Sequence, residues 1–318
     1  MPLDALLQNL LSPLVLAFVL GVVAALLRSD LRIPETLYAS LSIYLLLAIG
    51  LKGGVALSNT SVAAFAGPAL GTLALSLVTP LTAFGVLHRL LGFDRVNAAA
   101  LAAHYGSVSA VTFLAAVSFA TLLGLPSEGF MPALVALLEV PAIVVGLLLA
   151  NGLRGQSWRT ALHEVLVGRS IVLLVGGLVI GLVVGERGME GVKPFFVGGF
   201  QGALTLFLLE MGLATAQRLR DLRKVGVRLI GFALVVPVLH GLLGVWVGQA
   251  CGLGVGGSAV LGAMASSASY IAAPAAVRVA LPEASPTLYL TAALGVTFPF
   301  NLTLGLPLYF AFARWLGA

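Results

Sequence analysis

Two short serine-rich segments interrupt long apolar stretches of this chain, and they begin 160 residues apart. The first is Gly106-Ser107-Val108-Ser109 and the second is Ser266-Ser267-Ala268-Ser269. Lipid offers no hydrogen-bond partner to bare backbone groups, so a helix that stops inside a bilayer must face protein or a water-filled cavity. A pair of interrupted membrane helices, one in each half of a chain, indicates the substrate site of a secondary transporter.

The residue types in the two segments are suited to holding a small anion. Gly106 loosens the first helix, and the hydroxyls of Ser107 and Ser109 can accept hydrogen bonds from the first N–H groups of the next half-helix. Ser267 and Ser269 can do the same in the second segment. If the two half-helices start from opposite directions, their partial positive N-termini form a pocket for an oxygen-rich anion. The alternative is that these serines only bond to the preceding turn or join neighbouring helices.

Oxygen-bearing residues near the breaks are also suited to a hard cation such as sodium. Glu139 stands in an apolar stretch directly before Val140-Pro141, and an ionisable side chain inside a membrane is costly. We predict a coupling role for Glu139, with a structural ion pair or hydrogen bond as the alternative. The corresponding stretch of the second half offers the neutral oxygen donors Thr297 and Asn301, which complete the predicted sodium or coupling site.

No pattern in the chain predicts an enzyme. His104 lies one turn before Ser107, but no acidic residue is placed to orient it and no Gly-x-Ser-x-Gly nucleophile elbow is present. The sequence also contains no glycine-rich phosphate loop, no Cys/His metal spacing and no nucleic-acid motif. We therefore expect no catalytic residue, no cofactor, no metal other than sodium and no nucleic-acid partner.

The composition places these segments inside a membrane. Of the 318 residues, 60% are hydrophobic and 9% are charged, and the mean hydropathy is +1.10. Soluble domains carry about 25% charged residues. We expect an all-α integral membrane protein with about ten spans of roughly 20 residues each. The predicted spans are 11–27, 36–51, 63–87, 98–123, 131–150, 167–185, 194–214, 225–250, 258–280 and 287–316.

The predicted spans divide into two halves of five. Residues 1–150 form the first five-helix repeat, 151–168 a polar cytoplasmic linker, and 169–318 the second repeat. An odd number of spans in each half inverts the second half relative to the first, so that broken helices 4 and 9 cross near the midplane. Matching landmarks recur at offsets of 156 to 162 residues, namely Gly50 and Gly212, Ser107 and Ser267, Pro126 and Pro282, and Pro141 and Pro299.

Lysine and arginine residues are distributed unevenly between the two sides of this topology. Thirteen of the 17 lie on the side of the linker, and the other side holds Lys52, Arg187, Lys193 and Arg314. Because positively charged loops remain in the cytoplasm, both termini of this multi-pass protein should lie outside the cell membrane. The basic run 218–224 sets topology, or alternatively binds anionic membrane lipid or a cytoplasmic regulator.

Six motifs are spread over nearly the whole chain. They are Ile33-Pro34-Glu35, Ile49-Gly50-Leu51-Lys52-Gly53-Gly54, Gly106-Ser107-Val108-Ser109-Ala110, Glu139-Val140-Pro141-Ala142, Ala265-Ser266-Ser267-Ala268-Ser269-Tyr270-Ile271-Ala272-Ala273-Pro274 and Gly295-Val296-Thr297-Phe298-Pro299-Phe300-Asn301. With these motifs the chain resembles the SbtA-type sodium-dependent bicarbonate transporter family. The resemblance implies a ten-helix inverted-repeat carrier that imports bicarbonate with sodium, assembles as a homotrimer and is controlled by a PII-like protein responsive to adenine nucleotides.

The same resemblance assigns roles to the matching residues. The facing serine clusters would bind the anion, and Glu139 corresponds to the acidic residue of the fifth span. Cyanobacterial members of the family carry an Asp where Tyr270 stands, and they have a longer cytoplasmic linker. We include Tyr270 in the predicted substrate site, where a phenol replaces a possible sodium ligand.

These observations together favour a secondary active transporter, a sodium-dependent bicarbonate symporter for inorganic carbon uptake. Two alternatives remain within transport: a sodium symporter for a small organic carboxylate, and a sodium/proton exchanger in which Glu139 carries the proton. A gated channel or a non-transporting membrane sensor represents a different class. Saturable, sodium-driven uptake of bicarbonate separates the first prediction from all of these.

Overall fold

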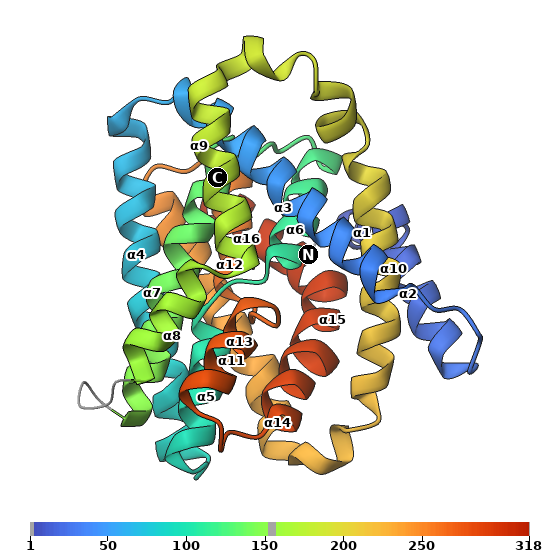
Figure 1. Ribbon diagram of the computed structural model, residues 1–318, viewed down its shortest axis with the longest axis vertical. Helices are drawn as coiled ribbons and strands as arrows, with labels where there is room; N and C mark the ends of the chain where they lie inside the picture. The colour runs from blue at the N-terminus through green and yellow to red at the C-terminus, as the bar shows by residue number, and fades with distance from the viewer. Residues whose placement is uncertain (1–2, 152–156, 318) are drawn as a thin grey trace.

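The computed structural model describes residues 3–151 and 157–317, and these residues form helices joined by short connections, without a strand (Figure 1). Seven described helical segments are long and apolar enough to cross a membrane. They are Glu35–Ser58, Val62–Leu90, Arg95–Leu122, Met131–Ala150, Arg169–Met189, Leu222–Ala250 and Pro286–Leu316. The shorter apolar helices Pro13–Leu26 and Val255–Ala265 accompany them. The chain is therefore an all-helical, multi-pass membrane protein.

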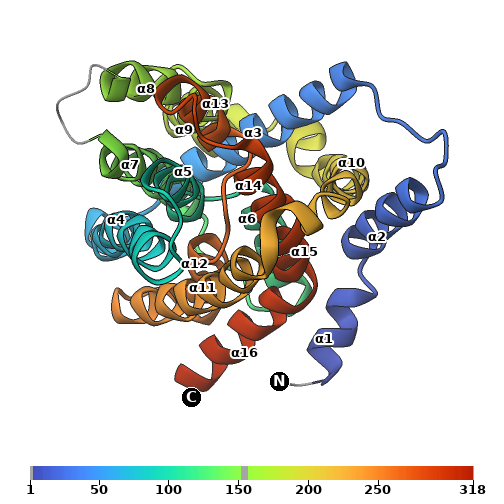
Figure 2. The same ribbon diagram turned by 90° about the horizontal axis from the view of Figure 1, so that it is seen from below.

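Four helices form two close pairs at one side of the molecule, and we call them the flanking helices. Helix α2 (Pro13–Leu26) packs on α10 (Phe200–Leu219), and α3 (Glu35–Ser58) packs on α9 (Arg169–Met189) (Figure 2). Glycines permit both contacts, because a Cβ at Gly21 would lie 3.1 Å from the Cα of Gly212 and one at Gly50 would lie 2.9 Å from the Cα of Gly177. Small residues of this kind let membrane helices approach closely.

The remaining long helices form a central bundle of two clusters. Helices α4 (Val62–Gly85), α5 (Arg95–Gly106) and α7 (Met131–Asn151) pack together, and so do α11 (Leu222–Ala250), α12 (Val255–Ala265) and α16 (Leu306–Leu316). The clusters are joined where α6 (Ala110–Leu122) contacts α12 and where α13 (Ala272–Ala280) contacts α5. The two interrupted spans, α5–α6 and α12–α13, therefore cross in the middle of the bundle (Figure 1).

Helices cover each of the ten predicted spans, and two regions differ in detail from the simplest expectation. The last predicted span contains α14 (Pro286–Leu290), the π-helical segments η4 (Thr291–Thr297) and η5 (Asn301–Gly305), and the short α15 (Phe298–Phe300) between them. The predicted linker 151–168 includes helix α8 (Ser157–Leu166), which packs against α13, while residues 152–156 of this linker lie outside the described part of the chain. Short helix α1 (Leu3–Leu10) precedes α2.

Candidate functional site

The first break separates α5 from α6 and is fixed by neighbouring side chains. Gly106 ends α5 directly against α4, since a Cβ at this position would lie 2.6 Å from the Cβ of Pro80. The hydroxyl of Thr79 donates a hydrogen bond of 3.2 Å to the Gly106 carbonyl, which has lost its helical partner. Ser109 then begins α6, and its hydroxyl accepts the backbone N–H of Thr112 at 3.1 Å, as an N-cap does.

The second break separates α12 from α13 and uses its serines to complete the helix ends. The hydroxyls of Ser266 and Ser267 donate to the carbonyls of Ala263 and Met264 at 2.9 and 2.7 Å. Ser269 accepts the backbone N–H of Ala273 at 3.2 Å. The hydroxyls of Ser266 and Ser269 thus bond to backbone groups that a helix end or start leaves open, while the Met264 carbonyl also accepts the backbone N–H of Ser267.

The two breaks contact each other directly. The backbone N–H of Ser109 donates to the hydroxyl oxygen of Ser267 at 2.8 Å, and the backbone N–H of Ser269 donates to the carbonyl of His104 at 2.9 Å. His104 is itself held by a 2.7 Å contact between its Nδ1 and the Ala100 carbonyl and by stacking on Tyr289. The N-termini of α6 and α13, which carry partial positive charge, therefore begin at one crossing.

A small cavity lies at this crossing. Its volume is about 10 Å³, and it is lined by Val108, Ser109, Ala110, Glu139, Ser170, Ser269, Tyr270 and Ile271. The structure thus brings together four of the predicted site residues. They are Ser109 of the first break, Ser269 and Tyr270 of the second break, and Glu139 of α7. A volume of about 10–15 Å³ is what one water molecule requires, so a bicarbonate-sized anion needs the crossing to widen.

Three polar side chains at the crossing are buried without a partner among the described residues. Glu139 is 5% exposed, and its carboxylate takes part in no hydrogen bond or ion pair. The hydroxyl of Ser107, which is 1% exposed, is also without a partner, and that of Tyr270, which is 9% exposed, lies near the side chain of Ser109 without forming a hydrogen bond of standard geometry. Because an unpaired buried polar group costs about 1–3 kcal/mol, three of them beside two helix N-termini point to a ligand-binding role.

Thr297 and Asn301 do not line this cavity. The Thr297 hydroxyl donates to the Ala233 carbonyl at 2.7 Å and contacts the hydroxyl of Tyr105 at 2.7 Å. The side-chain amide of Asn301 donates to the Ser266 carbonyl at 2.9 Å, and its oxygen accepts the hydroxyl of Tyr309 at 3.1 Å. The predicted sodium or coupling set is thus divided, since only Glu139 lines the cavity, while Asn301 supports the second break and Thr297 joins α11 to Tyr105 of α5.

Ser170 is a lining residue that the sequence did not single out. It is the second residue of α9, and it also borders a second cavity of about 320 Å³ that includes Glu164, Arg169, Ile271 and Ala275. The two cavities share Ser170 and Ile271 as lining residues. The site is therefore adjacent to open volume on the side of α8, α9 and α13.

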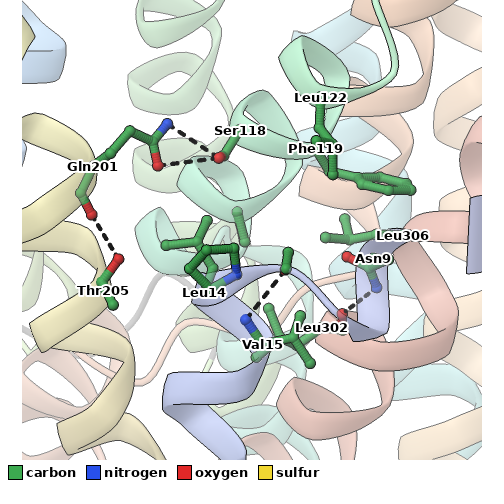
Figure 3. Close-up of a pocket in the computed structure, with 13 residues that line it drawn as sticks. Asn9, Leu14, Val15, Ser118, Phe119, Leu122, Gln201, Thr205, Leu302 and Leu306 are labelled. Atoms are coloured by element: carbon green, nitrogen blue, oxygen red, sulfur yellow. Dashed lines mark hydrogen bonds between the residues drawn. The ribbon is translucent and has the colours of Figure 1, made fainter. Parts of the chain in front are cut away.

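A separate cavity with its own hydrogen bonds lies beside α6, where the flanking helices meet the central bundle (Figure 3). A cavity of about 250 Å³ there has none of its lining residues in common with the site. Ser118 of α6 and Gln201 of α10 exchange hydrogen bonds of 3.1 and 3.2 Å, and the Asn9 amide donates to the carbonyls of Leu302 and Thr303. The Ser118–Gln201 contact joins the bundle to the flanking helix α10, and Asn9 joins α1 to η5 of the last span (Figure 3).

The all-helical fold of the described residues, with seven candidate membrane spans, is consistent with a membrane transporter. Residues 13–314 match the model of the Na⁺-dependent bicarbonate transporter superfamily. The match covers most of the chain, so the protein belongs to this superfamily, and the resemblance carried by the six motifs is confirmed. No curated protein matches the chain.

Proposed function

We propose that the protein is a secondary active symporter that takes up bicarbonate together with sodium. The observation that supports this most directly is the contact between two helix breaks beside the unpaired carboxylate of Glu139. Partial positive N-termini favour an anion, and a carboxylate favours a cation. A site that combines them is suited to an anion and a cation bound together.

The proposed cycle follows from the cost of moving charge through a medium of low dielectric constant. Sodium binds first near Glu139 and strengthens the positive field at the starts of α6 and α13. Bicarbonate then binds to the N–H groups and to the free hydroxyls of Ser107 and Tyr270. The central bundle moves past the flanking helices only when both ions are present, because their charges then offset one another.

We also propose that the chain is a duplication of five spans with the second half inverted, giving ten spans in all. The glycine contacts support this, because Gly21 and Gly212 correspond to Gly177 and Gly50 at offsets of 156 and 162 residues. The two close pairs of flanking helices are thus related by the repeat. The division at 151–168, both termini outside the cell membrane, a homotrimer and a PII-like regulator belong to the same proposal and rest on charge distribution and family resemblance.

The test uses purified protein in vesicles with labelled bicarbonate, with and without an inward sodium gradient. We expect saturable uptake that disappears when the gradient is removed. Ser109→Ala and Ser269→Ala should lower this uptake about two- to tenfold, as the loss of a neutral hydrogen bond worth about 0.5–1.5 kcal/mol would. Unchanged uptake in both variants rejects the site, and sodium-independent uptake rejects the coupling.

A second candidate is a sodium/proton exchanger that uses Glu139 as the proton carrier. The absence of any ion-pair partner for this carboxylate among the described residues favours it. A sodium gradient would then acidify or alkalinise the vesicle lumen without bicarbonate, which a pH-sensitive dye detects. Competition of labelled bicarbonate with acetate or lactate tests the remaining alternative, a symporter for a small organic carboxylate.

A further inference from the structure

A large polar cavity lies where α2 and α10 end, away from the crossing of the two breaks. Its volume is about 530 Å³, and its lining includes Arg28, Arg32, Glu210, Gln217 and Arg220. Pockets of about 300–1,000 Å³ are typical of small-molecule sites in proteins. This volume is far larger than a bicarbonate ion needs, and none of these residues borders the candidate transport site.

The three arginines of this cavity carry charge that the described residues do not neutralise. In the neighbouring basic run, Arg218 and Lys224 form ion pairs with Asp221 at 4.0 and 2.6 Å. Arg28, Arg32 and Arg220 form no ion pair in the described part of the chain.

Acidic groups near the cavity reduce this charge only in part. Glu210 contributes one carboxylate to the wall, and Asp30 and Glu35 lie in and after the connection from α2 to α3 without pairing to the arginines. Three guanidinium groups face one lining carboxylate, so the cavity favours an anion of more than one charge.

The backbone at Arg28 adds an independent observation. Its φ of 58° is left-handed, and Arg28 is the one non-glycine residue with positive φ in the described part of the chain. The N–H of Arg28 bonds to the Ala25 carbonyl and that of Ser29 to the Ala24 carbonyl, which closes the end of α2 in a Schellman arrangement. Glycine is strongly favoured at this position, because a Cβ disfavours the left-handed conformation. An arginine occupies this position against the backbone's preference, and it lines a cationic cavity.

We propose that this cavity binds a ligand through a phosphate group. The planar guanidinium matches phosphate oxygens with two parallel hydrogen bonds, and three such groups around one cavity suit a phosphate of two or more charges. The phosphate belongs either to an anionic lipid headgroup or to a soluble phosphate compound, since the cavity lies at the ends of membrane helices. This proposal is independent of the transport cycle.

The experiment measures binding to the purified, detergent-solubilised full chain by calorimetry. One arm titrates inorganic pyrophosphate, and the other titrates dioctanoyl phosphatidic acid, whose phosphate monoester can carry two charges, with dioctanoyl phosphatidylcholine as the lipid control. We expect at least one of the two anionic probes to bind and the zwitterionic lipid not to bind. Binding of pyrophosphate alone assigns a soluble ligand, and binding of phosphatidic acid alone assigns a headgroup.

The informative variant is Arg28→Gly, which removes the side chain and supplies the residue that the backbone prefers. We expect its affinity for the bound probe to fall about tenfold or more, while its melting temperature stays equal or rises. Arg220→Gln should weaken binding similarly without touching the left-handed position. The matched control is Arg314→Gln, which removes an exposed positive charge of α16 that does not line the cavity. This variant should bind the probe as the unaltered protein does. Failure of both anionic probes to bind, or unchanged affinity in Arg28→Gly and Arg220→Gln, overturns the proposal.

Discussion

The two helix breaks have similar sequences but use their side chains differently. At the break between α12 and α13, Ser266, Ser267 and Ser269 are all hydrogen-bonded to backbone groups of their own helices. At the break between α5 and α6, Ser109 caps a helix while the hydroxyl of Ser107 has no partner among the described residues. The serines of the second break thus act mainly as a structural frame, whereas Ser107 of the first break has a buried hydroxyl without a partner.

The helices that follow the breaks differ in the same way. α7 brings the unpaired Glu139 to the cavity, whereas the corresponding stretch of the last span brings Thr297 and Asn301 into hydrogen bonds. That stretch is π-helical on both sides of α15, and π-helical turns often mark positions where a helix adapts to a functional site. Here they accompany an asparagine that holds the Ser266 carbonyl.

One pair of contacts occupies equivalent positions in the two halves of the chain. The side chain of Asn97, near the start of α5, accepts the N–H of Ser285 at 2.8 Å. Glu128, 157 residues before Ser285, accepts the N–H of Gly254 at 2.7 Å, and Gly254 lies 157 residues after Asn97. Each interrupted span is therefore attached to the other half at its outer end. The two attachments are alike, whereas the serines of the two breaks differ in their hydrogen bonds.

The largest effect is expected where the difference between the halves is greatest, at Glu139. Glu139→Gln keeps the size of the side chain and removes its charge, so it should lower sodium-driven uptake about ten- to hundredfold, the equivalent of about 1.5–3 kcal/mol for a charged contact. Its melting temperature should not fall, because no hydrogen bond or ion pair among the described residues is lost. Uptake and thermal unfolding are measured on the same preparation.

The matched change in the second half is Thr297→Val, which keeps the side-chain shape. It leaves the Ala233 carbonyl and the Tyr105 hydroxyl without this partner, so stability should fall by about 1–3 kcal/mol. If the Thr297→Val protein melts normally but its uptake no longer depends on sodium, Thr297 binds sodium. That result would contradict the conclusion that only Glu139 of the predicted sodium set lies at the site.

The second prediction concerns the serines of the two breaks. Ser267→Ala leaves the buried N–H of Ser109 without an acceptor and should cost about 1–3 kcal/mol of stability. Ser107→Ala removes no hydrogen bond within the described structure, so stability should change by less than about 0.5 kcal/mol. Bicarbonate affinity should nevertheless fall several-fold in Ser107→Ala. The reverse pattern, a stability loss confined to Ser107→Ala, would show that the first break is the frame.

Much of the site could be predicted because its signals are local. Glycine and serine interrupt apolar stretches at 106–109 and 266–269, and a carboxylate is conspicuous in an apolar helix at Glu139. These features depend on the neighbouring residues in the chain, and the structure brings both breaks and Glu139 together. The all-helical class follows from composition in the same direct way.

The features that were missed depend on tertiary contacts. The sequence gives no sign that Thr297 faces Tyr105 and Ala233, or that Ser170 at the start of α9 reaches the cavity. The left-handed φ of Arg28 contradicts the residue's own preference and is not visible in any local pattern. Helix α8 was missed for another reason, because its polar residues resemble those of a connecting loop.

The third prediction compares the two attachments between halves. Glu128→Ala removes a charged acceptor at the N-terminus of α12. Asn97→Ala removes a neutral acceptor for the N–H before α14, together with an exposed hydrogen bond from the Asn97 amide to Asp94 that we expect to contribute little. A charge-assisted hydrogen bond is roughly twice as strong as a neutral one, so we expect losses of about 2 and about 1 kcal/mol. Thermal unfolding of the two variants and of the double variant checks this. Losses in the opposite order would mean that the charge of Glu128 destabilises the folded protein.

The smallest effect is expected at Asp94, which begins α5 and has no capping counterpart at Gly254 in the second half. Partial burial opposes its ionisation, but hydrogen bonds from the backbone N–H and side-chain amide of Asn97 hold the pKa of the Asp94 carboxyl below its ordinary value. A carboxyl with a lowered pKa in the folded state stabilises above its unfolded pKa of about 3.9, and this stabilisation is lost as the pH falls through the folded pKa.

We therefore expect Asp94→Ala to melt lower than the unaltered protein at pH 7, by an amount corresponding to about 1 kcal/mol for a lost N-cap. The difference should shrink steadily as the pH is lowered from about 5 towards 3, because the unaltered protein then loses the charged cap as well. The matched variant in the second half is Glu128→Gln, because the Glu128 carboxylate accepts the N–H of Gly254 and so supplies the capping charge of α12. Gly254→Ala would not remove that charge. A difference between Asp94→Ala and the unaltered protein that is constant with pH would mean that the cap acts through its shape and not through its charge.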